Sequence, residues 1–202
     1  RHAWGMTEMS PLGTTNHAGG HRQKYSSEEF AAVRTNVGTP IWGVDIKITD
    51  DDNHELPWDG KAFGALKVRG PWVCSSYFKD NESDAHAEDG WFETGDVATV
   101  SATGFVSITD RTKDVIKSGG EWISSIEVEN VATGHAQVAE AAVIGRIHDK
   151  WGERPLLIVV KASGESPSPE ELKAYLDGKI AKWWIPDDVQ FIEAMPHTAT
   201  GK

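Results

Sequence analysis

Two neighbouring segments of the 202-residue chain carry the side chains best suited to chemistry. They are residues 90–96, GWFETGD, and residues 110–123, DRTKDVIKSGGEWI. A carboxylate such as Asp96 can accept hydrogen bonds from ribose hydroxyls, and a cation such as Arg111 can bind phosphate. Glycines allow the backbone to approach a ligand closely. Together these residue types favour a nucleotide site.

Asp96 is our candidate for binding the ribose. One carboxylate can accept hydrogen bonds from two vicinal hydroxyls, and its charge strengthens each bond relative to a neutral pair. The alternative is an aspartate that only caps a turn before a hairpin. The aromatic pair Trp91-Phe92 upstream and the pair Asp110-Arg111 downstream favour the functional interpretation.

Two more motifs accompany these segments: residues 4–8, WGMTE, and residues 196–202, PHTATGK. The end of the second segment, with the serine that follows it, forms a motif of its own at residues 117–124, KSGGEWIS. Each motif is modest by itself. In this order, however, the set resembles the adenylate-forming (AMP-binding) enzymes, and most closely their acyl-CoA synthetase branch. Residues 117–124 are most similar to medium- and long-chain fatty-acyl-CoA ligases and to 3-methylmercaptopropionate-CoA ligases.

The resemblance implies roles for the first motif. In that family the aromatic residue, here Trp4, packs on adenine, while Thr7 faces the phosphates and Glu8 holds Mg²⁺. A hard cation of this kind prefers a carboxylate and keeps most of its waters. Trp4 stands where the family has tyrosine, a change that keeps stacking and removes any hydroxyl contact.

The resemblance also implies roles around the second segment. Arg111 would be the second ribose contact beside Asp96, because its planar donor fork fits that role. Lys113 would be the hinge about which a C-terminal domain rotates between two half-reactions. For Lys113 taken alone, a solvated lysine on a surface turn is the favoured interpretation.

The last two motifs are assigned in the same way. Gly119, Gly120 and Trp122 would line the channel for the pantetheine arm of CoA, although a plain β-turn is compatible with the same residues. Lys202 would neutralise charge between the carboxylate and the α-phosphate during adenylation. His197 stands where arginine is commoner in the family.

The elements that position these residues fall into two parts. Alternation of apolar and polar residues predicts a mostly β first part, with strands at 41–48, 64–68, 72–77, 97–101 and 105–109, and a short helix near 26–34. The second part has predicted helices at 125–132 and 169–181 and predicted strands at 138–144, 156–160 and 189–192. Ser168 and Pro169 are typical of a helix start. Trp183-Trp184 is expected to close the core of this part.

The predicted fold class is α+β. Residues 1–110 would be the C-terminal part, and thus a β-rich remnant, of a large adenylate-binding domain. Residues 111–202 would form a small mobile α+β domain that is truncated at its end. We expect the chain to be cut at both ends, with the family's phosphate loop and most of its acyl pocket lying upstream.

Composition excludes several classes of protein. The net charge of −11 argues against a general grip on nucleic acid. The single cysteine, Cys74, rules out an internal disulfide and fits a reducing cytoplasm. No apolar run reaches the roughly 20 residues that a transmembrane helix needs. We expect a cytoplasmic protein, and a homodimer is among the assemblies that the resemblance allows.

The implied activity is that of an ATP-dependent acid-thiol ligase. A carboxylic acid of fatty type would be joined to AMP and then transferred to CoA, with Mg²⁺ as the metal. Two alternatives stay open: an adenylating enzyme that loads a carrier protein, and an inactive truncated module that binds a nucleotide. Residues 117–124 disfavour the first alternative. The missing phosphate loop supports the second for the isolated chain, which we expect to be inactive.

Overall fold

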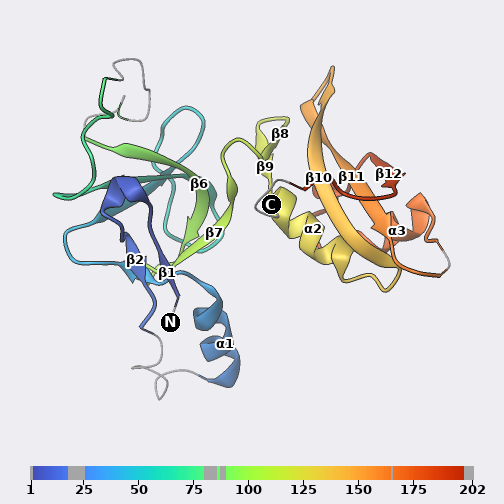
Figure 1. Cartoon of the computed structure of the whole chain (residues 1–202), viewed down its shortest axis with the longest axis horizontal. Coiled ribbons are helices and arrows are strands. Elements are labelled where there is room, and N and C mark those ends of the chain that lie inside the picture. Colours follow the sequence, from blue (N-terminus) through green and yellow to red (C-terminus); the bar gives the residue numbers. More distant parts are fainter. Residues whose placement is uncertain (1, 18–25, 80–85, 87–89, 165, 198–202) are drawn as a thin grey trace. The chain divides into compact units, whose positions relative to one another are not determined.

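The computed structural model describes residues 2–17, 26–79, 86, 90–164 and 166–197. The chain divides into two compact units, Arg1–Thr112 and Lys113–Lys202. Strands dominate both units and helices are few (Figure 1), which confirms the predicted α+β class.

A small and a larger sheet make up the first unit. The small sheet is antiparallel and joins β1 (Ala3–Trp4), β2 (Thr14–Thr15) and β3 (Thr39–Pro40). A 3₁₀ turn, η1 (Thr7–Met9), follows β1, and the expected helix forms as α1 (Ser27–Thr35). Val106 N donates to Gly38 O over 2.8 Å, so the segment leading into β3 is bonded to the start of β7.

The larger sheet is an antiparallel meander in chain order: β4 (Asp45–Thr49), β5 (Phe63–Arg69), β6 (Phe92–Val100) and β7 (Val106–Arg111). The last two strands form the predicted hairpin. Alternate residues of these strands supply the core because successive side chains of a strand point to opposite faces. The core cluster contains Met9, Val44, Ile46, Ile48, Leu66, Val68, Phe92, Ala98, Val100 and Val106.

The predicted strand at 72–77 is wrong. Residues 71–76 form turns and bends, in which Val73 N donates to Gly70 O over 3.1 Å. Cys74 N donates to Glu8 O over 2.8 Å, so this backbone is satisfied by η1 and not by a strand ladder. The predicted strand at 41–48 begins late, at Asp45, because Gly43 adopts a left-handed φ of 83°.

The second unit holds a five-stranded sheet. Its strands are β8 (Ile116–Ser118), β9 (Glu121–Ile123), β10 (Val138–His148), β11 (Gly152–Lys161) and β12 (Asp188–Ile192). The order is β10-β11-β8-β9, with β12 parallel to β11. Helix α2 (Ser125–Thr133) packs on β10, α3 (Pro169–Leu176) packs on β12, and the two helices contact each other.

The predicted start of α3 is confirmed and its predicted end is wrong. Ser168 and Glu171 form a capping box, with Pro169 in the first turn. The helix ends at Leu176 because Asp177 is extended and Gly178 has φ 76°.

The pair Trp183-Trp184 is divided between core and surface. Trp184 is buried as expected, but Trp183 is 54% exposed. Both residues lie in the 3₁₀ turn η4 (Lys182–Trp184), where neighbouring side chains leave the backbone in different directions. The expectation that both close the core was therefore wrong for Trp183.

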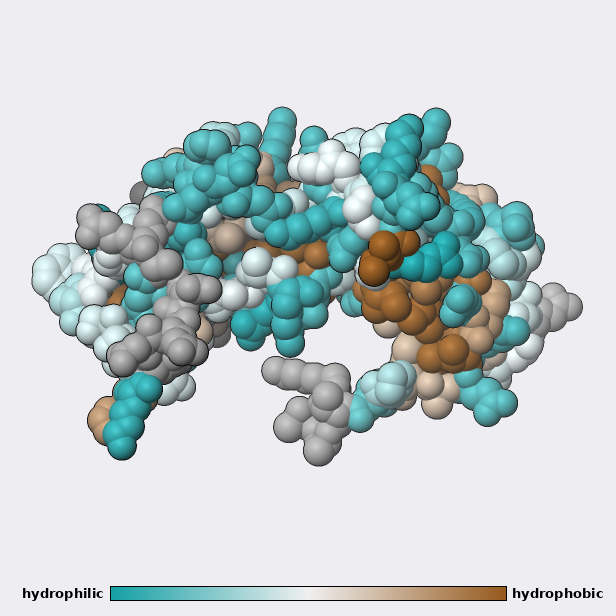
Figure 2. All heavy atoms as spheres, turned by 90° about the horizontal axis from the view of Figure 1, so that it is seen from above, coloured by the Kyte–Doolittle hydropathy of each residue, from teal (hydrophilic) through white to brown (hydrophobic). Residues whose placement is uncertain are grey.

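Apolar side chains gather on one face of the second unit, as Figure 2 shows. Two large apolar residues of β10, Ile144 and Ile147, are exposed, and β10 is an edge strand. Apolar surface at a sheet edge is typical of a contact with another protein segment. In the described part of the chain, none of the helices has the length and apolar character that crossing a bilayer requires.

Candidate functional site

Asp96 lies in a β-bulge of β6 and not in a turn before the hairpin. Val97 pairs with Ala65 and Glu93 pairs with Lys67, so extra residues are inserted between these pairs. Gly95 supplies the left-handed φ of 73° that the bulge requires. Thr94 Oγ1 stabilises it by donating to Leu66 O over 2.7 Å and accepting from Asp96 N over 3.1 Å.

The structure brings Asp96 together with Trp4 and Arg111. Trp4 Nε1 donates to Asp96 Oδ2 over 2.7 Å, and Arg111 Nη1 lies 3.0 Å from Asp96 Oδ1. Arg111 stands directly opposite Asp96 across β6 and β7. Asp96 is buried while Arg111 is half exposed. Each carboxylate oxygen keeps a second lone pair, so this trio can still accept bonds from two hydroxyls.

Trp4 is held firmly beside the carboxylate. A Cβ at Gly13 would lie 2.6 Å from Trp4 Cζ3, so only glycine allows this packing. The indole bond to Asp96 was missed by sequence reasoning, although a signal was present. The signal is Trp4 itself, because an indole N–H is a donor only and usually pairs with an acceptor where it is removed from water.

Thr7 and Glu8 lie in η1, apart from this bonded trio. Tyr77 donates its hydroxyl to Glu8 Oε1 over 2.9 Å, and Thr7 is exposed. Within the described residues, neither Thr7 nor Glu8 bonds to Trp4, Asp96 or Arg111. Tyr77 was not singled out from the sequence, because it falls in the wrongly predicted strand.

Glu8 could supply one ligand to a magnesium ion, but the described residues offer no complete metal site around it. No group of three histidine, cysteine or acidic residues could hold a metal in the part of the chain that is described. An ion at Glu8 would therefore take its other ligands from water and phosphate, which is how Mg²⁺ is commonly bound. Burial, with a smaller contribution from Glu8, raises the pKa of the nearby Cys74 thiol, so this sulfur is no competing thiolate.

Lys113 is the first residue of the second unit, and it lies exposed in a turn. The preceding residue is anchored, because Thr112 N donates to Gly95 O over 2.9 Å. The hinge role of Lys113 stays a prediction. Lys202 lies outside the described residues.

Gly119 and Gly120 form the turn between β8 and β9, with φ of 62° and 86°. Gly119 N donates to Trp151 O over 2.8 Å, and a Cβ on Gly119 would lie 2.8 Å from Trp151 Cε3. Only glycine fits at position 119, because the backbone is left-handed there and a side chain would collide with the Trp151 ring. Trp122, on β9, lies beneath Lys117, whose Nζ is 5.1 Å from the ring centre.

A cavity of about 370 Å³ opens beside this turn. Gly119 lines it, whereas Gly120 and Trp122 are not part of its lining. The lining residues are Ser118, Gly119, Glu121, Trp151, Arg154, Trp183 and Asp187. Sequence reasoning found only the glycine and missed the two tryptophans and the arginine. The signal for Arg154 was a charged residue directly before the apolar run 155–160, since a buried charge must be paired.

Arg154 holds the Asp187 carboxylate ionised. Hydrogen bonds from Arg154 lower the pKa of Asp187, burial partly opposes this, and the positive charges of Arg154 and Lys173 lower the pKa further. Arg154 Nε and Nη2 reach Asp187 Oδ1 over 3.0 and 2.8 Å.

This pKa shift predicts an acid-labile contribution to stability. A carboxyl whose folded pKa is depressed stabilises the fold above its unfolded pKa of about 3.9, and that stability is lost as the pH falls through the folded value. Asp187→Asn should therefore lower the midpoint of urea unfolding at pH 7, and the difference from wild type should shrink below about pH 4. Asp149→Asn, at an exposed aspartate, is the control. A difference independent of pH would contradict the pairing.

Two family models match the chain in order. The AMP-binding enzyme model matches residues 1–78, and the AMP-binding enzyme C-terminal domain matches residues 127–202. Among solved structures, o-succinylbenzoate CoA synthetase from Bacillus subtilis, in complex with its acyl-adenylate intermediate, is similar with a TM-score of 0.78 and 32% identity. That match covers 99% of this chain and 39% of the other.

Curated relatives agree with these models. A 3-methylmercaptopropionyl-CoA ligase of Ruegeria lacuscaerulensis is 56% identical over 201 residues, and a medium-chain-fatty-acid–CoA ligase of Ectopseudomonas oleovorans is 47% identical over 201 residues. Each match covers all of this chain, which spans about 37% of the length of either relative. From the two models and these relatives, the chain belongs to the AMP-binding enzyme family.

Proposed function

We propose that this chain is the C-terminal portion of an ATP-dependent acyl-CoA synthetase, an acid-thiol ligase acting on a carboxylic acid of fatty type. The first unit would complete the large adenylate-binding domain, and the second would be the small C-terminal domain. The observation that carries the proposal is the bonded trio Trp4, Asp96 and Arg111. It occurs in a chain whose whole length aligns with CoA ligases.

The adenylation half-reaction would use the first unit together with Lys202 of the second unit. Asp96 and Arg111 would hold the ribose and Trp4 the adenine, while Thr7 would face the phosphates. A carboxylate oxygen of the acid attacks the α-phosphorus of ATP, and pyrophosphate leaves. Mg²⁺ held at Glu8 would neutralise phosphate charge, and Lys202 would stabilise the charge between carboxylate and phosphate. The product, acyl-AMP, has a far better leaving group than the free acid.

The thioester half-reaction would use the second unit. Gly119 borders a cavity whose volume is within the range of small-molecule sites. Two partly exposed tryptophans, Trp151 and Trp183, offer it aromatic surface. We propose that CoA enters here and that Gly120 and Trp122 line the neighbouring part of the pantetheine channel. The CoA sulfur then attacks the acyl carbon, and AMP leaves.

The proposal is tested by paired assays on the complete enzyme. We expect ATP–pyrophosphate exchange that depends on an aliphatic acid and on Mg²⁺, and thioester formation with free CoA. Transfer to a carrier-protein pantetheine arm and not to CoA would favour the carrier-loading alternative. Absence of exchange would favour the inactive nucleotide-binding module. Cytoplasmic location and a homodimeric state stay predictions, which cell fractionation and light scattering would test.

A further inference from the structure

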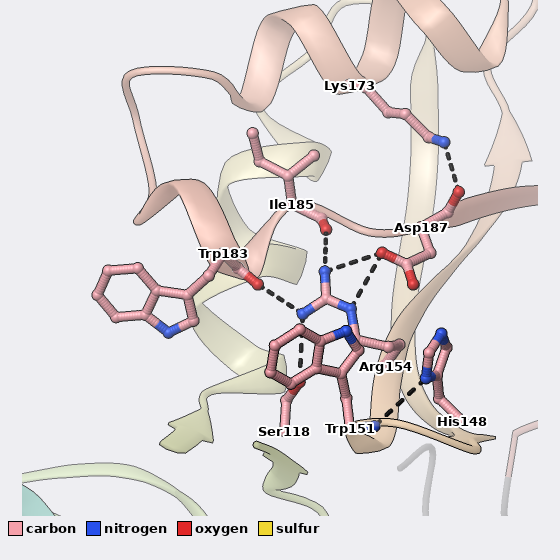
Figure 3. A network of polar contacts seen from close by, with 8 residues as sticks. All are labelled: Ser118, His148, Trp151, Arg154, Lys173, Trp183, Ile185 and Asp187. Carbon is pink, nitrogen blue, oxygen red and sulfur yellow. Dashed lines mark hydrogen bonds and ion pairs between the residues drawn. The ribbon is translucent and has the colours of Figure 1, made fainter. Parts of the chain in front are cut away.

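Arg154 joins three segments of the second unit, as Figure 3 shows. From β11 it donates to Ser118 Oγ at the end of β8, over 3.2 Å. It also donates to the main-chain oxygens of Trp183 and Ile185, over 2.8 and 3.2 Å. Its bonds to the Asp187 carboxylate complete the set. The side chain is only 14% exposed.

These bonds use the whole guanidinium. The group has five N–H donors, and the five bonds assign one acceptor to each. Arg154 lines the cavity, yet it has no donor left for a phosphate while these bonds persist. Its influence on a ligand must therefore pass through the groups that it holds.

The groups held by Arg154 belong to two separate parts of the cavity lining, Ser118 at the end of β8 and the segment that contains Trp183 and Asp187. Ser118 directly precedes Gly119, which is bonded to Trp151 O, while Trp183 is held through its own carbonyl. The neighbour of Arg154 acts on the same strand, since Lys117 N donates to Glu153 Oε2 over 2.9 Å. Consecutive residues of β11 thus hold consecutive residues of β8.

We propose that Arg154 is a positioning residue for CoA, which fixes the glycine turn and the Trp183 segment at the spacing that the ligand requires. This inference rests on the proposed function. It predicts that arginine is specifically needed, because a lysine side chain has a single nitrogen and cannot reach Ser118 and the acceptors along residues 183–187 at once.

The test compares half-reactions in the complete enzyme. Arg154→Ala should lower kcat/KM for CoA on the order of 10- to 100-fold. The loss should appear chiefly as a higher KM, because the displaced glycine turn and Trp183 segment would bind CoA less tightly. Arg154→Lys should recover little of this loss. Pyrophosphate exchange should stay within about twofold of wild type, since adenylation does not use the cavity. Arg146→Ala is the matched control, because this half-exposed arginine makes one ion pair, to Asp188.

Hydrogen exchange supplies a readout that needs no activity. Amides of residues 117–121 should exchange faster in both Arg154 variants than in Arg146→Ala. Ser118→Ala removes only the bond between Arg154 and Ser118 Oγ, so it should increase exchange of the same amides by a smaller amount. This variant replaces Arg154→Ala in the test if Arg154→Ala does not fold. Unchanged exchange with unchanged KM for CoA, or equal losses in both half-reactions, would overturn the positioning role. A wild-type enzyme that makes acyl-AMP and no thioester would instead overturn the proposed function.

Discussion

Replacing Asp96 with alanine in the complete enzyme should lower kcat/KM for ATP roughly 30- to 1,000-fold, which corresponds to about 2–4 kcal/mol. The variant would lose the proposed charged acceptor for two ribose hydroxyls. It also leaves the Trp4 indole N–H and the Arg111 guanidinium without the acceptor that now holds them. Steady-state kinetics with ATP as the varied substrate measure this effect.

Asp45→Ala is a matched control for this experiment. Asp45 lies in the same sheet and also pairs with an arginine, since Arg69 Nη2 is 3.1 Å from its Oδ2. This pair is exposed and should contribute little. Wild-type ATP kinetics in folded Asp96→Ala would mean that Asp96 only shapes the bulge of β6.

Lys113→Pro should retain formation of acyl-adenylate and lose transfer to CoA. Proline fixes φ near −65°, so a backbone change at this residue would be blocked. In the proposed mechanism the two half-reactions would need different groups at one site, Lys202 for adenylation and the glycine turn for thioester formation. Pyrophosphate exchange and thioester formation, measured on the same folded protein, separate these steps.

The control for the hinge is Lys113→Ala, which removes the charge and keeps the backbone freedom. It should retain both half-reactions, because the Lys113 side chain is exposed and alanine does not restrict φ as proline does. If Lys113→Pro keeps both half-reactions at wild-type rates, Lys113 is not the hinge, and domain rotation at this point is contradicted.

Local chemistry made much of the fold predictable. Ser168 and Pro169 mark the start of α3 because a cap acts on backbone groups a few residues away. The end of β10 was less predictable, since its apolar run stops at Ile144 while the strand continues to His148. Backbone pairing with β11 continues as far as His148, and this pairing does not depend on which side chains the residues carry.

The candidate site shows more clearly which features a sequence pattern cannot predict. Asp96 and Arg111 were found from the types of their side chains and their nearby motifs. The bulge that holds Asp96 depends on register with β5, and Arg154 depends on partners about 30 residues away in either direction. Such contacts are set by tertiary packing, and no local pattern encodes them.

An isotope experiment tests the acyl-adenylate mechanism most directly. The complete enzyme would be given ATP, CoA and a fatty acid labelled with ¹⁸O at both carboxyl oxygens. In the proposed mechanism one carboxylate oxygen bonds to the α-phosphorus and CoA sulfur later displaces AMP, so each AMP should carry one ¹⁸O and each acyl-CoA should keep one. Mass spectrometry of both products gives the answer. Unlabelled AMP, or ADP with the label in inorganic phosphate, would contradict the account.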